Sequence, residues 1–232
     1  MLGLAIAAAV STTNVVTSRG DQPLAVYGAA SPDKPLVLLL SGEGGWRAFD
    51  DEVASRLAAH GYAVGGIDCL RYFKTAQDDR AALAKDVRLF ADALASTVKA
   101  RAPARIVLAG YSFGADLAPW VAGVADRDPR IAALLLIGPD KVGSLQARLS
   151  EILGFHPTDH VFDTAEALAD ARDLPVLFVH GGDDEESDAP ALCEGFPGKK
   201  RLVVVPGSHH FSGHLDTLEA ALADGLATLL PK

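Results

Sequence analysis

The sequence contains few of the residues on which metal sites and disulfide-rich scaffolds depend. Its 232 residues include two cysteines, Cys69 and Cys193, and no CxxC or Cys/His cluster with the spacing of metal ligands. We therefore expect no metal site and no cofactor, whereas one disulfide and two free thiols both fit the sequence. No apolar run is both long enough and free enough of charge to span a bilayer.

Basic residues are also scarce relative to acidic ones. The chain has 21 Lys and Arg against 30 Asp and Glu, which gives a formal net charge of −9. Such a surface repels nucleic-acid phosphates and the anionic face of a membrane, and it attracts cations. The composition thus argues against a nucleic-acid partner and is compatible with a cationic substrate.

The N-terminal segment 2–10 is apolar and resembles the hydrophobic region of a signal peptide, but no Lys or Arg precedes it. A trimmed signal segment and a peripheral strand both remain open. The remaining composition, with 49% hydrophobic and 22% charged residues, is typical of a globular chain. The length fits one domain, which we predict over residues 1–232.

Short apolar runs alternate with helical patterns along this domain. The predicted strands are Leu36–Leu40, Ala63–Ile67, Arg105–Ala109, Ile131–Ile137, Val176–His180 and Leu202–Val205. The predicted helices are Asp50–Ala59, Ala81–Ala100, Phe113–Ala125 and Leu215–Leu230. This order predicts an α/β fold with a mostly parallel sheet and helices on both faces. Residues 139–173 form a candidate cap segment, with a short helical pattern near Ser144–Leu153.

The segment Gly110–Gly114 reads G-Y-S-F-G and lies between a predicted strand and a predicted helix. A G-x-S-x-G sequence in this setting is typical of the nucleophile elbow of α/β-hydrolases, in which a sharp turn exposes the serine hydroxyl. The helix that follows directs backbone N–H groups toward a developing oxyanion. Ser112 is therefore the candidate nucleophile.

An acid and a histidine follow in the order that this fold uses. Asp183 and Asp184 come after one predicted strand, and His209 and His210 come after the next. Position relative to the preceding glycine favours Asp184 and His210, with His209 as a neighbouring hydrogen-bonding or packing residue. In this scheme His210 takes the proton of Ser112, while Asp184 orients the imidazole.

The loop Ser41–Trp46 (SGEGGW) follows the first predicted strand. It lacks the G-K-[ST] of a phosphate-binding loop and the third glycine of a dinucleotide fingerprint. It fits the oxyanion loop of a hydrolase, where a backbone N–H of Glu43 or Gly44 joins that of Phe113.

Four segments together resemble the VirJ/AcvB family of bacterial virulence proteins. The family carries an S-G-D-G-G-W loop, a V-D-S-L-R-Y-F-W segment, the elbow G-Y-S-F-G-A-D with a later proline, and a G-G-H-H-F turn. The counterparts here are Ser41–Trp46, Ile67–Lys74, Gly110–Pro119 and Gly207–Phe211. Glu43, Cys69, Lys74 and Ser208 depart from the pattern, and the acidic loop is looser.

The resemblance implies a periplasmic hydrolase that cleaves the aminoacyl ester of lysyl-phosphatidylglycerol; a cytoplasmic location is the alternative. The acidic residues at the predicted strand ends suit a cationic acyl group. Arg71 is a candidate for the lipid phosphodiester or for an ion pair with Asp68, and Asp183, Trp46 and His209 are further candidate substrate contacts. Two other readings stay open: an esterase or thioesterase for small esters, and a non-catalytic secretion-accessory protein with this fold.

Overall fold

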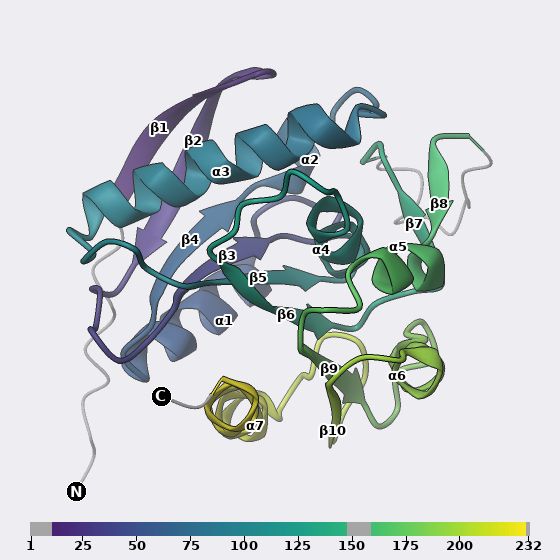
Figure 1. Cartoon of the computed structure of the whole chain (residues 1–232). Coiled ribbons are helices and arrows are strands. Elements are labelled where there is room, and N and C mark those ends of the chain that lie inside the picture. Colours follow the sequence, from purple (N-terminus) through teal and green to yellow (C-terminus); the bar gives the residue numbers. More distant parts are fainter. Residues whose placement is uncertain (1–10, 148–158, 231–232) are drawn as a thin grey trace, which may run out of the picture.

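One eight-stranded sheet forms the centre of the molecule (Figure 1). The computed structural model describes residues 11–147 and 159–230. The strands of the sheet are β1 (Ser11–Thr17), β2 (Gly20–Tyr27), β3 (Leu36–Leu40), β4 (Ala63–Ile67), β5 (Ile106–Tyr111), β6 (Ile131–Ile137), β9 (Val176–Gly181) and β10 (Lys200–Val205). Their spatial order is β1-β2-β4-β3-β5-β6-β9-β10. The pairs β1–β2 and β2–β4 are antiparallel, and the other neighbouring strands pair in parallel. The predicted α/β fold with a mostly parallel sheet is confirmed.

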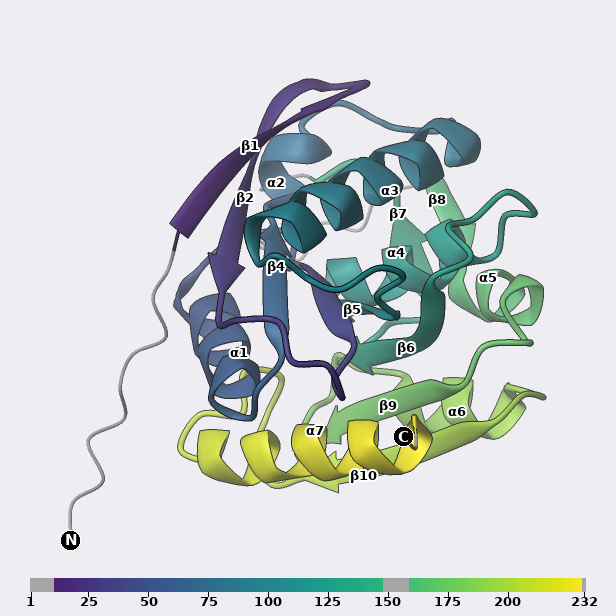
Figure 2. The same ribbon diagram turned by 60° about the vertical axis from the view of Figure 1, so that its left-hand side comes forward.

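Helices cover both faces of this sheet (Figure 2). The helices are α1 (Ala48–Ala59), α2 (Cys69–Tyr72), α3 (Arg80–Thr97), α4 (Phe113–Ala122), α5 (Thr164–Asp170), α6 (Ala189–Gly195) and α7 (Leu215–Leu229). Helices α1 and α7 lie on one face, and α3 to α6 lie on the other. Consequently, β3 divides its side chains between two cores: Leu36, Leu38 and Leu40 point to one, and Val37 and Leu39 to the other. Each buried side chain of this size contributes about 1.5–3 kcal/mol.

The strand and helix predictions agree with the structure in the interior and miss its periphery. All six predicted strands and all four predicted helices are present, with ends shifted by a few residues. The hairpin β1–β2 was not predicted, because its sequence is largely polar and covers a sheet edge. Cys69 and Cys193 are both buried and free.

The candidate cap segment contains a two-stranded sheet of β7 (Val142–Ser144) and β8 (Val161–Asp163), followed by α5. Ser144 is the last residue of β7, so the prediction of a helical pattern starting near Ser144 is wrong at that residue. Residues 148–153 of that prediction, and the apolar segment 2–10, lie outside the described residues. Within the described ranges, no helix has the length and apolar character that a membrane crossing needs.

Candidate active site

Ser112 occupies a strained turn between β5 and α4. Its backbone φ is 51° and its ψ is −122°, a combination that non-glycine residues adopt rarely and mostly at functional sites. The flanking glycines allow the turn: a Cβ on Gly110 would lie 2.0 Å from the carbonyl oxygen of Gly114, and one on Gly114 would lie 2.3 Å from that of Leu40. The nucleophile elbow predicted from G-Y-S-F-G is therefore present.

Asp184 and His209 form a buried pair beyond the ends of β9 and β10. The Nδ1 atom of His209 lies 2.9 Å from Oδ2 of Asp184, and both residues are 7% exposed. The other oxygen of Asp184 accepts the N–H groups of Glu186 (3.0 Å) and Ser187 (3.2 Å). Because the Nδ1–H group of His209 donates a hydrogen bond to Asp184, the Nε2 atom of His209 is left as the basic nitrogen.

The prediction that His210 is the partner of this carboxylate is wrong, whereas the choice of Asp184 over Asp183 agrees with the geometry. The backbone turns sharply after Gly207 (φ +106°) and again at Phe211 (φ 51°), whose ring is fully buried. Burial of Phe211 turns His209 inward and leaves His210 exposed, with its ring near Phe49 and Tyr111. The histidine that pairs with Asp184 thus lies two residues after Gly207, not three.

The end of β6 brings His209 to the side of Ser112. The N–H of Ser112 donates to the carbonyl oxygen of Ile137 at 2.8 Å, and the next residue, Gly138, lies against the imidazole. A Cβ on Gly138 would lie 2.9 Å from Cε1 of His209, and the φ of Gly138 is +63°. Sequence reasoning missed this glycine, although its place directly after a buried strand was a usable signal.

The ring of Tyr111 lies beneath the same site, 5.2 Å from that of His209. Among the described residues, Ser112 Oγ makes no hydrogen bond to either histidine. Catalytic hydrogen bonds are often long or poorly aligned in ligand-free enzymes and tighten only in the complex with substrate.

The predicted oxyanion loop lies beside the nucleophile. The N–H of Gly45 donates to the carbonyl oxygen of Gly42 at 3.1 Å, which closes a turn with Glu43 and Gly44 at its corner. A Cβ on Gly42 would lie 3.9 Å from Cβ of Ser112. The backbone N–H of Phe113, the first residue of α4, has no acceptor within its own helix. These donors belong to the two elements that flank Ser112, as expected for an oxyanion hole.

Two predicted substrate contacts have other roles. The indole of Trp46 covers Gly66, where a Cβ would lie 2.1 Å from the ring, and its Nε1 donates to Asp51 (2.8 Å) and to the hydroxyl of Tyr27 (3.0 Å). The guanidinium of Arg71 donates to the backbone oxygen of Asp21 at 3.3 Å. Arg71 and Asp68 form no ion pair between their side chains. The carboxylate of Asp68 instead accepts the backbone N–H of Arg71.

Acidic residues surround the site. Asp183, Glu185 and Glu186 are exposed on the loop after β9. Burial raises the pKa of the Tyr111 phenol well above its usual range, and the carboxyl groups of Asp50, Asp184, Glu186 and Glu43 raise it further. The electrostatic potential around Tyr111, beside the catalytic candidates, is therefore negative.

Asp116 connects the elbow helix to the loop after β6. Its carboxyl group is buried, and its Oδ1 accepts the N–H of Asp140 at 2.8 Å. Burial raises the pKa of Asp116 well above its usual range. A carboxylic acid in the first turn of α4 that binds a backbone N–H of the neighbouring loop has a structural role.

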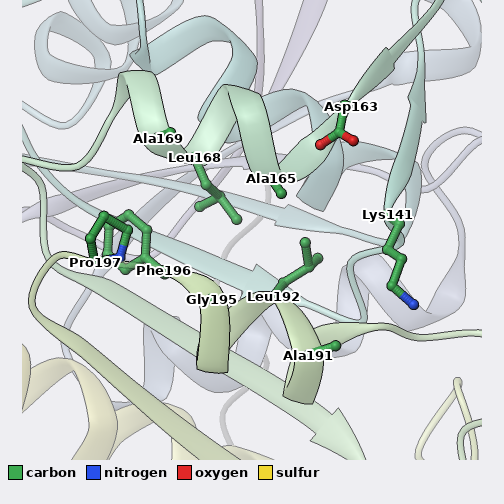
Figure 3. Close-up of a pocket in the computed structure, with 10 residues that line it drawn as sticks. All are labelled: Lys141, Asp163, Ala165, Leu168, Ala169, Ala191, Leu192, Gly195, Phe196 and Pro197. Atoms are coloured by element: carbon green, nitrogen blue, oxygen red, sulfur yellow. The ribbon is translucent and has the colours of Figure 1, made fainter.

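A separate hollow of about 210 Å³ lies between α5 and α6 (Figure 3). Leu168 and Leu192 point into it from the two helices, and Lys141 and Asp163 stand at its rim. None of the predicted site residues lines it. The part of the chain that the structure describes also contains no group of three or more His, Cys, Asp and Glu arranged to hold a metal ion.

Comparison with known proteins shows the family of the chain. The family model described as "Bacterial virulence protein (VirJ)" matches residues 34–229. A local stretch of 77 residues is 36% identical to glutamate-1-semialdehyde 2,1-aminomutase of Persephonella marina, but it covers 32% of this chain and only 17% of that protein. So small a share of the aminomutase carries no function over.

Solved α/β-hydrolase structures share the whole fold. Est1E from Butyrivibrio proteoclasticus superposes with a TM-score of 0.67 at 18% identity, covering 95% of this chain and 99% of that one. Dienelactone hydrolase from Anabaena variabilis gives 0.69 at 18%, with 97% and 99% covered. XC6422 from Xanthomonas campestris, described as an a/b serine hydrolase without lid, gives 0.62 at 21%, with 96% of each chain covered. At these identities the likeness establishes the fold.

Proposed function

The chain belongs to the VirJ family of bacterial virulence proteins, and we propose that it is a periplasmic serine hydrolase that cleaves the aminoacyl ester of lysyl-phosphatidylglycerol. The observation that carries the hydrolase assignment is the buried pair of Asp184 and His209 beside the strained turn of Ser112. A module that only binds has no need for these three groups together.

The chemistry follows from this arrangement. His209 takes the proton of Ser112 through Nε2 while Oγ attacks the ester carbonyl, and Asp184 stabilises the imidazolium that forms. The N–H groups of Phe113 and of Glu43 or Gly44 hold the oxyanion, and each such donor is worth about 3 kcal/mol in the transition state. His209 returns the proton to the glycerol oxygen, and water then releases the amino acid from Ser112.

The substrate class is supported by charge. The exposed carboxylates of Asp183, Glu185 and Glu186 stand at the catalytic edge of the sheet, where they attract the two ammonium groups of a lysyl ester. Arg71 is exposed and uses one guanidinium nitrogen for the backbone oxygen of Asp21, so its role as a contact for the phosphodiester stays a prediction.

The decisive experiment is incubation with vesicles of lysyl-phosphatidylglycerol and measurement of free lysine. We expect release by the native protein and none by Ser112→Ala. Brisk cleavage of short-chain esters without lysine release would favour the small-ester hydrolase. A native protein that a fluorophosphonate does not label at Ser112 would favour the binding protein and refute the hydrolase.

A further inference from the structure

Behind the oxyanion loop lies a carboxyl group that the catalytic chemistry above does not use. Asp50, in the first turn of α1, is 2% exposed. Its Oδ2 accepts the backbone N–H of Arg47 at 2.9 Å. Its Oδ1 is buried without a hydrogen-bond partner. A buried carboxyl oxygen with no donor is costly when charged, so this position needs a reason.

Arg47 links Asp50 to the loop. Its backbone is held by Asp50, and its side chain donates from Nε to the carbonyl oxygen of Gly44 at 2.7 Å. The carbonyl oxygen of Gly42 accepts from Gly45. The carbonyl group of Gly42 shares its peptide unit with the N–H of Glu43, and the carbonyl group of Gly44 shares its unit with the N–H of Gly45. With both carbonyl groups engaged, the peptide units on either side of the corner have a fixed orientation, and so does the N–H of Glu43.

We infer that Asp50 is a positioning residue for ester hydrolysis: through Arg47 it holds the turn Gly42–Gly45 in the shape that presents backbone N–H groups to the oxyanion. This inference rests on the proposed serine chemistry but on no particular ester.

The protonation state of Asp50 gives this role a distinctive signature. Burial raises its pKa to about 7, and the hydrogen bond from Arg47 together with the nearby backbone N–H groups of Asp50 and Gly42, which lie outside hydrogen-bond geometry, partly offsets this effect. The titratable and charged groups near it are Arg47 and Asp51 on its own helix, the thiol of Cys69 and the phenol of Tyr111. None of the last three supplies a positive charge. Ionised Asp50 would place negative charge behind a loop that must hold a negative oxygen, so the neutral acid is the active form.

The test measures the rate constant for fluorophosphonate labelling of Ser112 at pH 6 and pH 8, together with thermal unfolding. Asp50→Ala should slow labelling by at least about tenfold at both pH values, because donors of the oxyanion hole are worth about 100-fold or more each. Asp50→Asn copies the neutral acid, so it should label at close to the native rate at pH 6 and faster than native at pH 8. Glu52→Gln, an exposed change on the same helix, is the matched control and should leave the rate unchanged.

A folded Asp50→Ala that labels at the native rate overturns the inference, as does an Asp50→Asn rate that keeps the same ratio to native at both pH values. If Asp50→Ala does not fold, Arg47→Ala decides the matter. It removes only the contact to Gly44 at the surface, and a native labelling rate would then refute the inference. Native protein that is not labelled at all refutes the proposed function instead, and this inference with it.

Discussion

The two loops on either side of Ser112 treat a buried carboxyl group in opposite ways. In the loop after β9, Asp184 has three hydrogen-bond partners: His209 and the N–H groups of Glu186 and Ser187. Behind the loop after β3, Asp50 in the first turn of α1 has the N–H of Arg47 on one oxygen and no hydrogen bond on the other. Two buried carboxyl groups therefore have different proposed roles. Asp184 would orient the base, whereas Asp50 would shape a backbone turn while staying uncharged.

The largest expected effect is that of removing the proposed general base, His209. His209→Ala should lower kcat by about a millionfold, the loss seen when the histidine of a serine-protease triad is removed. His210→Ala is the control, and we expect no more than about a threefold change, because its exposed imidazole lies outside the hydrogen-bonded pair. Hydrolysis of a short-chain ester by both variants measures this. The reverse ranking would reinstate His210 as the base.

Removing the charge of Asp184 tests the role of its carboxylate in orienting His209. Asp184→Asn should lower kcat by about 10⁴-fold, because an amide favours the wrong tautomer of the imidazole. Asp183→Asn changes an exposed neighbour whose backbone N–H, not its side chain, holds the loop through Gly207. Steady-state kinetics of the pair should separate them clearly; equal losses would contradict the assignment.

The contact between Gly138 and His209 gives a smaller, steric effect. A methyl group at Gly138 meets Cε1 of His209 at 2.9 Å, and displacing a catalytic group by about 1 Å costs about 100-fold. We expect Gly138→Ala to lower kcat by that order. Gly20→Ala is matched in backbone strain, since Gly20 has φ +79° but nothing within 4 Å of the added methyl. Similar activity in the two variants would show that the imidazole can move aside without loss.

The buried carboxyl group of Asp50 should make the free energy of unfolding depend on pH. The pKa of Asp50 is raised from 3.8 to about 7 in the folded protein, so the folded state keeps a proton that the unfolded chain releases. This contribution is complete below pH 3.8, is lost as the pH rises toward 7, and is constant above it. Its size is at most about 4 kcal/mol, since each pKa unit corresponds to about 1.4 kcal/mol.

Urea unfolding at pH 5 and pH 8 measures this effect. We expect the native protein to lose stability relative to Asp50→Asn between the two pH values, with Glu52→Gln following the native protein. Parallel behaviour of the native protein and Asp50→Asn would mean that Asp50 ionises as readily when folded as when unfolded.

Residues buried on both faces of the sheet made the interior of the fold predictable. The apolar run of β4 and the strand-turn-helix setting of Ser112 each specify an element almost alone. The choice between His209 and His210 could not be predicted in the same way, because it depends on Phe211 reaching a core formed by distant segments. The burial of Asp50 could not be predicted from the sequence either. In the sequence it is an ordinary acidic residue at the start of a helix, and its burial depends on how the loop after β3 packs against it.

The stacking of Trp46 on Gly66 has a consequence for how activity can be altered from a distance. The indole of Trp46 packs directly on Gly66 in the middle of β4. The geometry of the loop therefore depends on Gly66, a buried residue. Any side chain at Gly66 would displace the indole and, through its neighbours in the loop, the donors beside Ser112. A substitution at Gly66 is thus expected to lower turnover without altering any residue of the proposed catalytic site.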